Sequence, residues 1–216
     1  MCGADAAILN GGDLYANLLP GEVTFREVEE CFARDQNLCV VRVTPAELKS
    51  ILEQGLSRLT LDKETLALDY EASAYDGFPQ VSGFSYLCDL TEPVGKRVRE
   101  IKMQDGTILD LEDKETVLTL AGSQYMFSGG YGYDARNVQE PAGITQIQAL
   151  AAYISSGKIN SRYDGVSRAK VIGNTDDTIA SGYPVGLMAL AAIVMILLTS
   201  HPIIKRTSVF QNGNER

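Results

Sequence analysis

Short apolar stretches separated by turn residues make up most of the first 172 residues of the chain. Stretches of aliphatic and β-branched residues that are bounded by Gly, Pro, Asn or Asp are typical of β-strands. Turn sequences fall at Asn10–Gly12, Glu92–Gly95 and Gln104–Gly106. The pattern therefore predicts strands over Ala4–Leu9, Leu38–Val43, Gln80–Cys88, Arg97–Met103 and Thr116–Gly122.

Helix signals alternate with these strands. Capping boxes begin at Thr24 and Thr44, and they predict a helix over Phe25–Phe32 and a second one that starts at Pro45. The second helix carries an apolar stripe formed by Leu48, Ile51, Leu52 and Leu56. A third, amphipathic helix is predicted over Ile144–Ile154. Together the elements predict an α/β (α+β) fold in which helices pack on a mixed β-sheet.

An uncharged apolar stretch lies near the C-terminus. No residue from Thr178 to Ile204 carries a formal charge. As a helix, residues 183–204 would be about 33 Å long, enough for a bilayer core of roughly 30 Å. Lys205 and Arg206 follow directly, as the positive-inside rule expects of a cytoplasmic flank. The stretch therefore predicts one transmembrane helix, with the preceding domain extracellular and the C-terminus cytoplasmic.

This assignment divides the chain into four parts. We expect a folded domain over 1–172, a small and polar linker over 173–182, the membrane helix over 183–204 and a short tail over 205–216. The alternative is a buried helix of a soluble core, because Pro202 interrupts the end of the run. No apolar stretch opens the chain, so no signal peptide is visible. For an extracellular domain, we therefore expect the N-terminus to be incomplete.

Composition excludes several classes of function. Acidic residues outnumber basic ones by 28 to 19, and a formal charge of −9 argues against nucleic acid as a partner. His201 is the only histidine, which excludes most hydrolytic metal sites and histidine-based triads, so neither catalytic nor metal-binding residues are predicted. The chain has four cysteines, Cys2, Cys31, Cys39 and Cys88, and their spacing does not match a metal site. We predict buried free thiols, and disulfide pairing is the alternative that the sequence leaves open.

Three local features could line a ligand site. They are the Asn10–Gly12 turn, Arg34, and the Gly-rich stretch Ser128–Tyr133 with its tyrosines. Glycines let the backbone approach a ligand closely, and tyrosines can stack on a flat base. The alternative is that the glycines only make turns and the tyrosines pack the sheet edge. Asp13 and Asp35 belong to no spaced set of carboxylates.

The order and spacing of several sequence blocks are more informative about function than each block alone. The blocks ADAAILNGG, LCVVRVTPAELKSILEQGL, GFPQVSGFSYLCDL and SQYMFSGGYGYDA, in this order, resemble the C-terminal domain of the 5′-nucleotidase family over about residues 4 to 172. The resemblance implies a domain that recognises a nucleotide or nucleoside-like ligand. It also implies an N-terminal metallophosphoesterase domain that binds two divalent metals. The chain has no such metal motif, so we expect the chain alone to be inactive.

The family's Asn-Gly-Gly-Gly-hydrophobic-Arg motif is kept in part. Asn10 and Gly12 match it, whereas Asp13 stands at the third glycine and Tyr15 at the substrate arginine. Loss of that cation weakens the expected recognition of phosphate. The resemblance therefore implies a changed ligand preference.

The aromatic and acidic positions of the family are also altered. One aromatic residue of the pair that sandwiches the base falls on Arg34, and the other falls on Tyr125. The acidic residue of the Gly-Gly-Asp-Gly motif, which resembles a ribose ligand, is Tyr131, directly after Gly130. An arginine can still stack on a base, and a tyrosine keeps a π face.

Two interpretations follow. In the first, the chain is the nucleotide-recognition part of a membrane-anchored surface phosphoesterase of nucleotide catabolism. In the second, it is a degenerate, non-catalytic binding or spacer module at the cell surface. A third class, a soluble enzyme with its own active site, needs a catalytic set that the sequence does not contain.

Overall fold

The computed structural model describes residues 3–19, 21–65, 68–69, 71–73, 75–135, 140–157 and 167–172. The predicted linker, membrane helix and tail lie outside these residues. Among the described residues, no helix has both the length and the apolar character needed to cross a bilayer.

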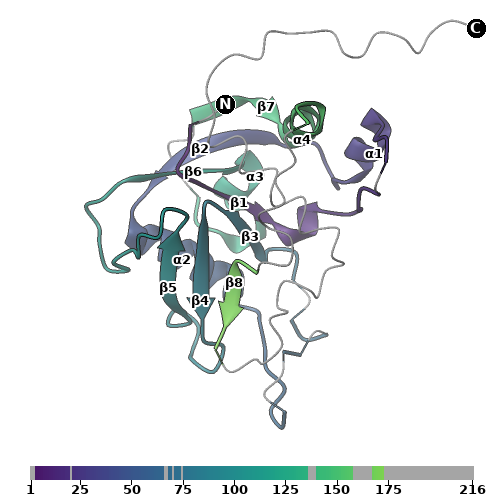
Figure 1. Cartoon of the computed structure of the whole chain (residues 1–216). Coiled ribbons are helices and arrows are strands. Elements are labelled where there is room, and N and C mark those ends of the chain that lie inside the picture. Colours follow the sequence, from purple (N-terminus) through teal and green to yellow (C-terminus); the bar gives the residue numbers. More distant parts are fainter. Residues whose placement is uncertain are drawn as a thin grey trace, which may run out of the picture.

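A five-stranded mixed sheet forms one part of the domain (Figure 1). Its strand order is β3-β1-β6-β2-β7, in which β1 and β6 run parallel and the other neighbours run antiparallel. The strands are β1 (Ala6–Asn10), β2 (Asn37–Val43), β3 (Pro79–Ser82), β6 (Leu118–Ser123) and β7 (Glu140–Thr145). All five residues of β1 are buried, because both faces of the sheet are covered.

A second sheet of three strands lies beside the first (Figure 1). Its order is β5-β4-β8, with β4 (Phe84–Cys88) between β5 (Val98–Met103) and β8 (Ala169–Val171). The β4–β5 pair is antiparallel, and β8 runs parallel to β4. The predicted fold class is therefore correct, but the structure has two mixed sheets where the sequence pattern indicated one.

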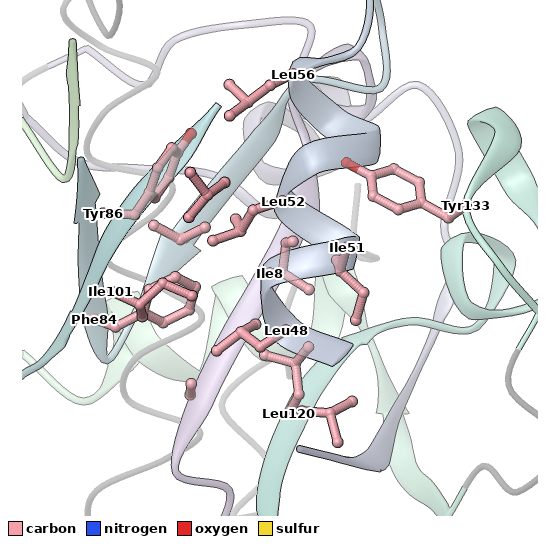
Figure 2. Close-up of a cluster of buried hydrophobic side chains, with 14 of the residues drawn as sticks. Ile8, Leu48, Ile51, Leu52, Leu56, Phe84, Tyr86, Ile101, Leu120 and Tyr133 are labelled. Atoms are coloured by element: carbon pink, nitrogen blue, oxygen red, sulfur yellow. The ribbon is translucent and has the colours of Figure 1, made fainter. Parts of the chain in front are cut away.

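The helix α2 (Pro45–Leu56) packs against both sheets and forms the main core. Its predicted capping box is present, with Pro45 in the first turn. The predicted stripe meets apolar side chains from each sheet, as Figure 2 shows for Leu48, Ile51, Leu52, Leu56, Ile8, Leu120, Phe84, Tyr86 and Ile101. One helix therefore buries one face of each sheet.

Polar contacts also tie the end of α2 to the second sheet. The buried Glu53 carboxylate accepts hydrogen bonds from the backbone N–H groups of Gly95 and Val98, at 2.9 and 2.6 Å. Arg97 donates to the carbonyl oxygens of Leu56 and Leu59. The contact with Leu56 gives a partner to the last carbonyl group of the helix, and the contact with Leu59 holds the segment that follows it.

The opposite face of the five-stranded sheet is covered by α4 (Gln146–Ser155), and α1 (Phe25–Glu30) packs beside α4 (Figure 1). Both helices begin with capping boxes, at Thr145 and Thr24. The predicted helices are thus confirmed, with ends within two residues of the expected ones. The remaining helical turns are η1 (Gly11–Asp13), α3 (Gln124–Phe127) and η2 (Gly130–Gly132).

The single strand predicted over Gln80–Cys88 is wrong. The chain forms two strands that belong to different sheets, and it changes direction at Gly83, whose φ is +84°. A Cβ atom at this position would lie 2.7 Å from the Asp5 carbonyl oxygen. Glycine is therefore required where the chain passes from one sheet to the other.

Two strands were missed by the sequence analysis. Polar residues and a Pro-Ala-Gly sequence hide β7, which is an edge strand, and β8 has only three residues. Such strands carry too little alternation to predict. The thiol prediction is confirmed for Cys31 and Cys88, which are buried and form no disulfide, and Cys39 is buried as well. Cys2 lies outside the described residues.

Candidate ligand site

The first side of the candidate site is the turn that ends β1. Asn10 is fully buried, and the chain continues as a single 3₁₀ turn, Gly11–Asp13. The backbone N–H of Gly12 donates to the carbonyl oxygen of Asp76 at 2.8 Å. A Cβ atom on Gly12 would lie 2.3 Å from the Asp76 Cβ, so only glycine fits. The predicted Asn-Gly-Gly turn therefore packs tightly against the segment before β3.

The second side is the Gly-rich loop after α3. Tyr131 has φ +54°, which is the only positive φ at a non-glycine residue in the described part of the chain. The Tyr75 hydroxyl donates to the carbonyl oxygen of Tyr131, and the Tyr131 ring meets Tyr125 edge-on, with 5.4 Å between the ring centroids. Gly130 allows this arrangement, since a Cβ there would be 2.4 Å from the Tyr125 ring. Backbone strain of this kind is concentrated at functional sites.

Asp13 joins the two sides. Its side chain is 3% exposed, and the Tyr131 hydroxyl donates to Asp13 Oδ1 at 3.3 Å. Asn10 Nδ2 donates to Asp13 Oδ2 at 3.5 Å, and Gln36 Nε2 donates to Oδ1 at 3.4 Å. All three distances lie at the long end for hydrogen bonds. The carboxylate is thus buried but weakly held.

Several polar atoms around Asp13 have unused hydrogen-bonding capacity. Gln146 is 2% exposed, and its side chain lies near enough to lower the pKa of Asp13. Within the described residues, no partner at ordinary distance and angle reaches Asn10 Oδ1, Gln36 Oε1 or either amide atom of the Gln146 side chain. Buried polar atoms in native proteins nearly always have partners. This cluster is therefore the strongest indication of a ligand site in the domain.

Burial controls the ionisation of the two groups that join the sides. Desolvation raises the pKa of Asp13 above its ordinary value, although the polar side chains of Tyr131, Gln146 and Asn10 act against it. Desolvation and the nearby Asp13 raise the pKa of Tyr131 to about 12. The Tyr131 hydroxyl therefore stays protonated at neutral pH and donates to the carboxylate.

We expect Asp13→Asn to stabilise the fold. The raised pKa means that the charged carboxylate opposes folding, and an amide can also donate to the unpaired oxygen of Asn10 or Gln36. Since one buried hydrogen bond is worth about 1 kcal/mol, Tm should rise by roughly 2–4 °C at pH 7. The gain should disappear at pH values below the ordinary pKa of an aspartate, where Asp13 is protonated in both states.

Thermal unfolding of the full chain across pH would test this expectation. The matched control is Asp134→Asn, which removes the same charge from an exposed position close to the Gly-rich loop. A lower Tm for Asp13→Asn at pH 7 would show that the carboxylate supports the fold.

The structure brings together most of the predicted site residues. Asn10, Gly12, Tyr125, Gly130 and Tyr131 all lie in the two sides described above. Arg34 stands apart, because it is exposed and its charge is the weakest of the influences on the pKa of Asp13. In the described residues no group of His, Cys, Asp and Glu side chains could hold a metal ion. Gln36 and Gln146, which also lie at the site, were not predicted from the sequence, because neither belongs to a motif.

Similarity to known proteins places the chain in a family. The family model described as 5′-nucleotidase, C-terminal domain, matches residues 1–137. The chain belongs to this family. A 5′-nucleotidase C-terminal domain of this kind forms part of longer proteins, as the relatives show. The trifunctional nucleotide phosphoesterase protein YfkN of Bacillus subtilis (strain 168) is 31% identical over 135 residues, which are 61% of the chain and 8% of YfkN.

Two further relatives have the same character. The probable 5′-nucleotidase of Treponema pallidum (strain Nichols) is 30% identical over 132 residues, which are 60% of the chain and 20% of that protein. The crystal structure of a 5′-nucleotidase precursor from Thermus thermophilus has 25% sequence identity and a TM-score of 0.64, over 80% of this chain and 32% of that one. The chain thus spans a fifth or less of the two curated relatives.

The structure shows where the residues lie that differ from the family's motifs. Tyr15, which the resemblance assigns to the position of a substrate arginine, is 72% exposed. By the same resemblance, Asp13 stands where the family has a glycine, and Tyr131 stands where it has an acid. The Tyr131 hydroxyl donates a hydrogen bond to the Asp13 carboxylate. In this 5′-nucleotidase C-terminal domain, an acid–tyrosine contact therefore joins the turn and the loop.

Proposed function

We propose that this 5′-nucleotidase C-terminal domain is the nucleoside- or nucleotide-recognition part of a membrane-anchored phosphoesterase at the cell surface. The two divalent metals and the catalytic residues would belong to a metallophosphoesterase domain outside this chain. Residues 183–204 would anchor the protein in the bilayer, with the domain extracellular and the tail after residue 204 cytoplasmic. The chain alone would not hydrolyse phosphate esters.

One observation carries the ligand part of this proposal. The rings of Tyr125 and Tyr131 lie next to a buried polar cluster whose amide oxygens have no partner in the described part of the chain. An aromatic face suits a nucleobase, and hydrogen-bond acceptors suit the hydroxyl groups of a sugar. Both kinds of contact occur within one site.

Binding of adenosine and AMP to the full chain in a mild detergent would test this part. Tyr125 is half-exposed, so the substitution Tyr125→Ala removes a stacking surface without opening the core. Loss of one base stack costs about 1–3 kcal/mol, so we expect the affinity for the bound ligand to fall by roughly tenfold or more. Isothermal titration calorimetry measures the change.

The conservative variant Tyr125→Phe is the matched control, because it keeps the ring and loses only the hydroxyl. It should bind nearly as well as the original chain. If neither adenosine nor AMP binds a folded full chain, the second interpretation, a degenerate spacer module, is favoured.

A further inference from the structure

The unpaired atoms around Asp13 are mostly hydrogen-bond acceptors. Asn10, Asp13 and Gln146 are almost fully buried; the first two belong to the turn that ends β1, and Gln146 begins α4. Asn10 Oδ1, Gln36 Oε1 and Gln146 Oε1 can each accept a hydrogen bond, and the one remaining donor, Gln146 Nε2, lies near Asp13. The Asp13 carboxylate adds lone pairs, because its three donors are 3.3–3.5 Å away. The cluster therefore fits a ligand that donates hydrogen bonds.

Charge around the cluster disfavours an anion. A phosphate beside an ionised Asp13 would be repelled, because two negative charges interact strongly in a partly dry environment. No cation is held within the cluster in the described residues: Tyr15 replaces the arginine of the family motif, and Arg34 is exposed. The cluster therefore has no guanidinium group that could bind a phosphate, and the charge of Asp13 would repel one.

The side of the cluster next to solvent is formed by Tyr131. Its ring is only partly buried, and its hydroxyl occupies one lone pair of Asp13. A ligand hydroxyl can replace the tyrosine hydroxyl there without leaving the carboxylate unpaired, because both groups are neutral donors.

We infer that Asp13 makes the site selective for a neutral, hydroxyl-rich ligand, and that the domain binds the unphosphorylated sugar moiety of a nucleoside in preference to a nucleoside phosphate. This inference rests on the proposed function. It adds that Asp13 determines specificity, with Asn10 and Gln146 as the amide side chains that receive the remaining hydroxyl groups.

Calorimetric titration of the full chain with three probes would test the inference. Adenosine supplies the sugar hydroxyls, 2′,3′-dideoxyadenosine lacks two of them, and AMP adds the phosphate. We expect adenosine to bind at least tenfold more tightly than either of the others. In Asp13→Asn, we expect adenosine to lose at least tenfold in affinity while AMP does not, so that their ratio approaches one.

Two controls keep the result interpretable. Asp13→Asn is expected to be more stable than the original chain, so weaker binding by this variant is not a sign of unfolding. Asp134→Asn removes the same charge from an exposed position and should keep the original ratio.

The possible failures are distinguishable. Binding of AMP as tight as that of adenosine, or an unchanged ratio in Asp13→Asn, would overturn the assignment of Asp13 and leave the proposed function standing. Absence of binding by all three probes to a folded chain would overturn both.

Discussion

Replacing Ile193 and Leu197 by Lys is expected to release the protein from membranes. Each lysine at the centre of a membrane helix costs about 2.5–3.5 kcal/mol on the insertion scale, and a single anchoring helix has no second span to compensate for the loss. The original chain should stay in the pellet after a carbonate wash, and the double variant should move to the supernatant. Immunoblotting of the two fractions measures the change.

A matched control places the same two charges outside the apolar run. Asn174→Lys together with Thr175→Lys lies in the predicted linker and should leave the protein in the pellet. If the Ile193/Leu197 variant also stays in the pellet, residues 183–204 are not the anchor. The ligand site would be unaffected by that result, because all of its residues precede residue 147.

Truncating Leu52 to Ala is expected to cause the largest loss of stability in the folded domain. Leu52 is fully buried on α2 in the cluster that joins the two sheets (Figure 2). Removing a buried leucine side chain costs about 2–5 kcal/mol, because apolar burial is lost and a cavity remains. Urea unfolding of the full chain in detergent should show a lower midpoint with an unchanged slope.

Leu19→Ala is the control for this substitution. Leu19 is 78% exposed, so the same change in chemistry removes almost no burial, and we expect the unfolding midpoint to stay within error. Equal losses in the two variants would mean that the cluster around α2 is not the core on which stability depends.

Local signals in the sequence were sufficient for the helices α1, α2 and α4 and for the strands β1, β2, β5 and β6. The capping boxes at Thr24 and Thr44 and the stripe on α2 act within one or two turns, so they can be recognised without knowledge of the fold. The assignment of strands to sheets has no such local signal. Gly83 divides two strands because of a close approach to Asp5, which is distant in the chain.

The candidate site shows the same division. The glycine turn and the Gly-rich loop were found from the sequence because glycines mark special backbone conformations. Gln36 and Gln146 were missed, because each is an ordinary polar residue at the end of a segment, and only the packing of α4 on the sheet brings them to Asp13. Asp13 itself was noticed, but its burial is a property of the assembled fold.

The polar contacts that Glu53 and Arg97 make between α2 and the start of β5 have a consequence for the Gly-rich loop. Apolar packing alone would let α2 slide along its axis, whereas these directional contacts set its position. Gln54, on the same helix, lies against Gly132 of the Gly-rich loop. The β4–β5–β8 sheet therefore helps to set the position of the Gly-rich loop through α2, although it supplies no residue of the candidate site. We expect substitutions in that sheet to change ligand binding without any contact with the ligand.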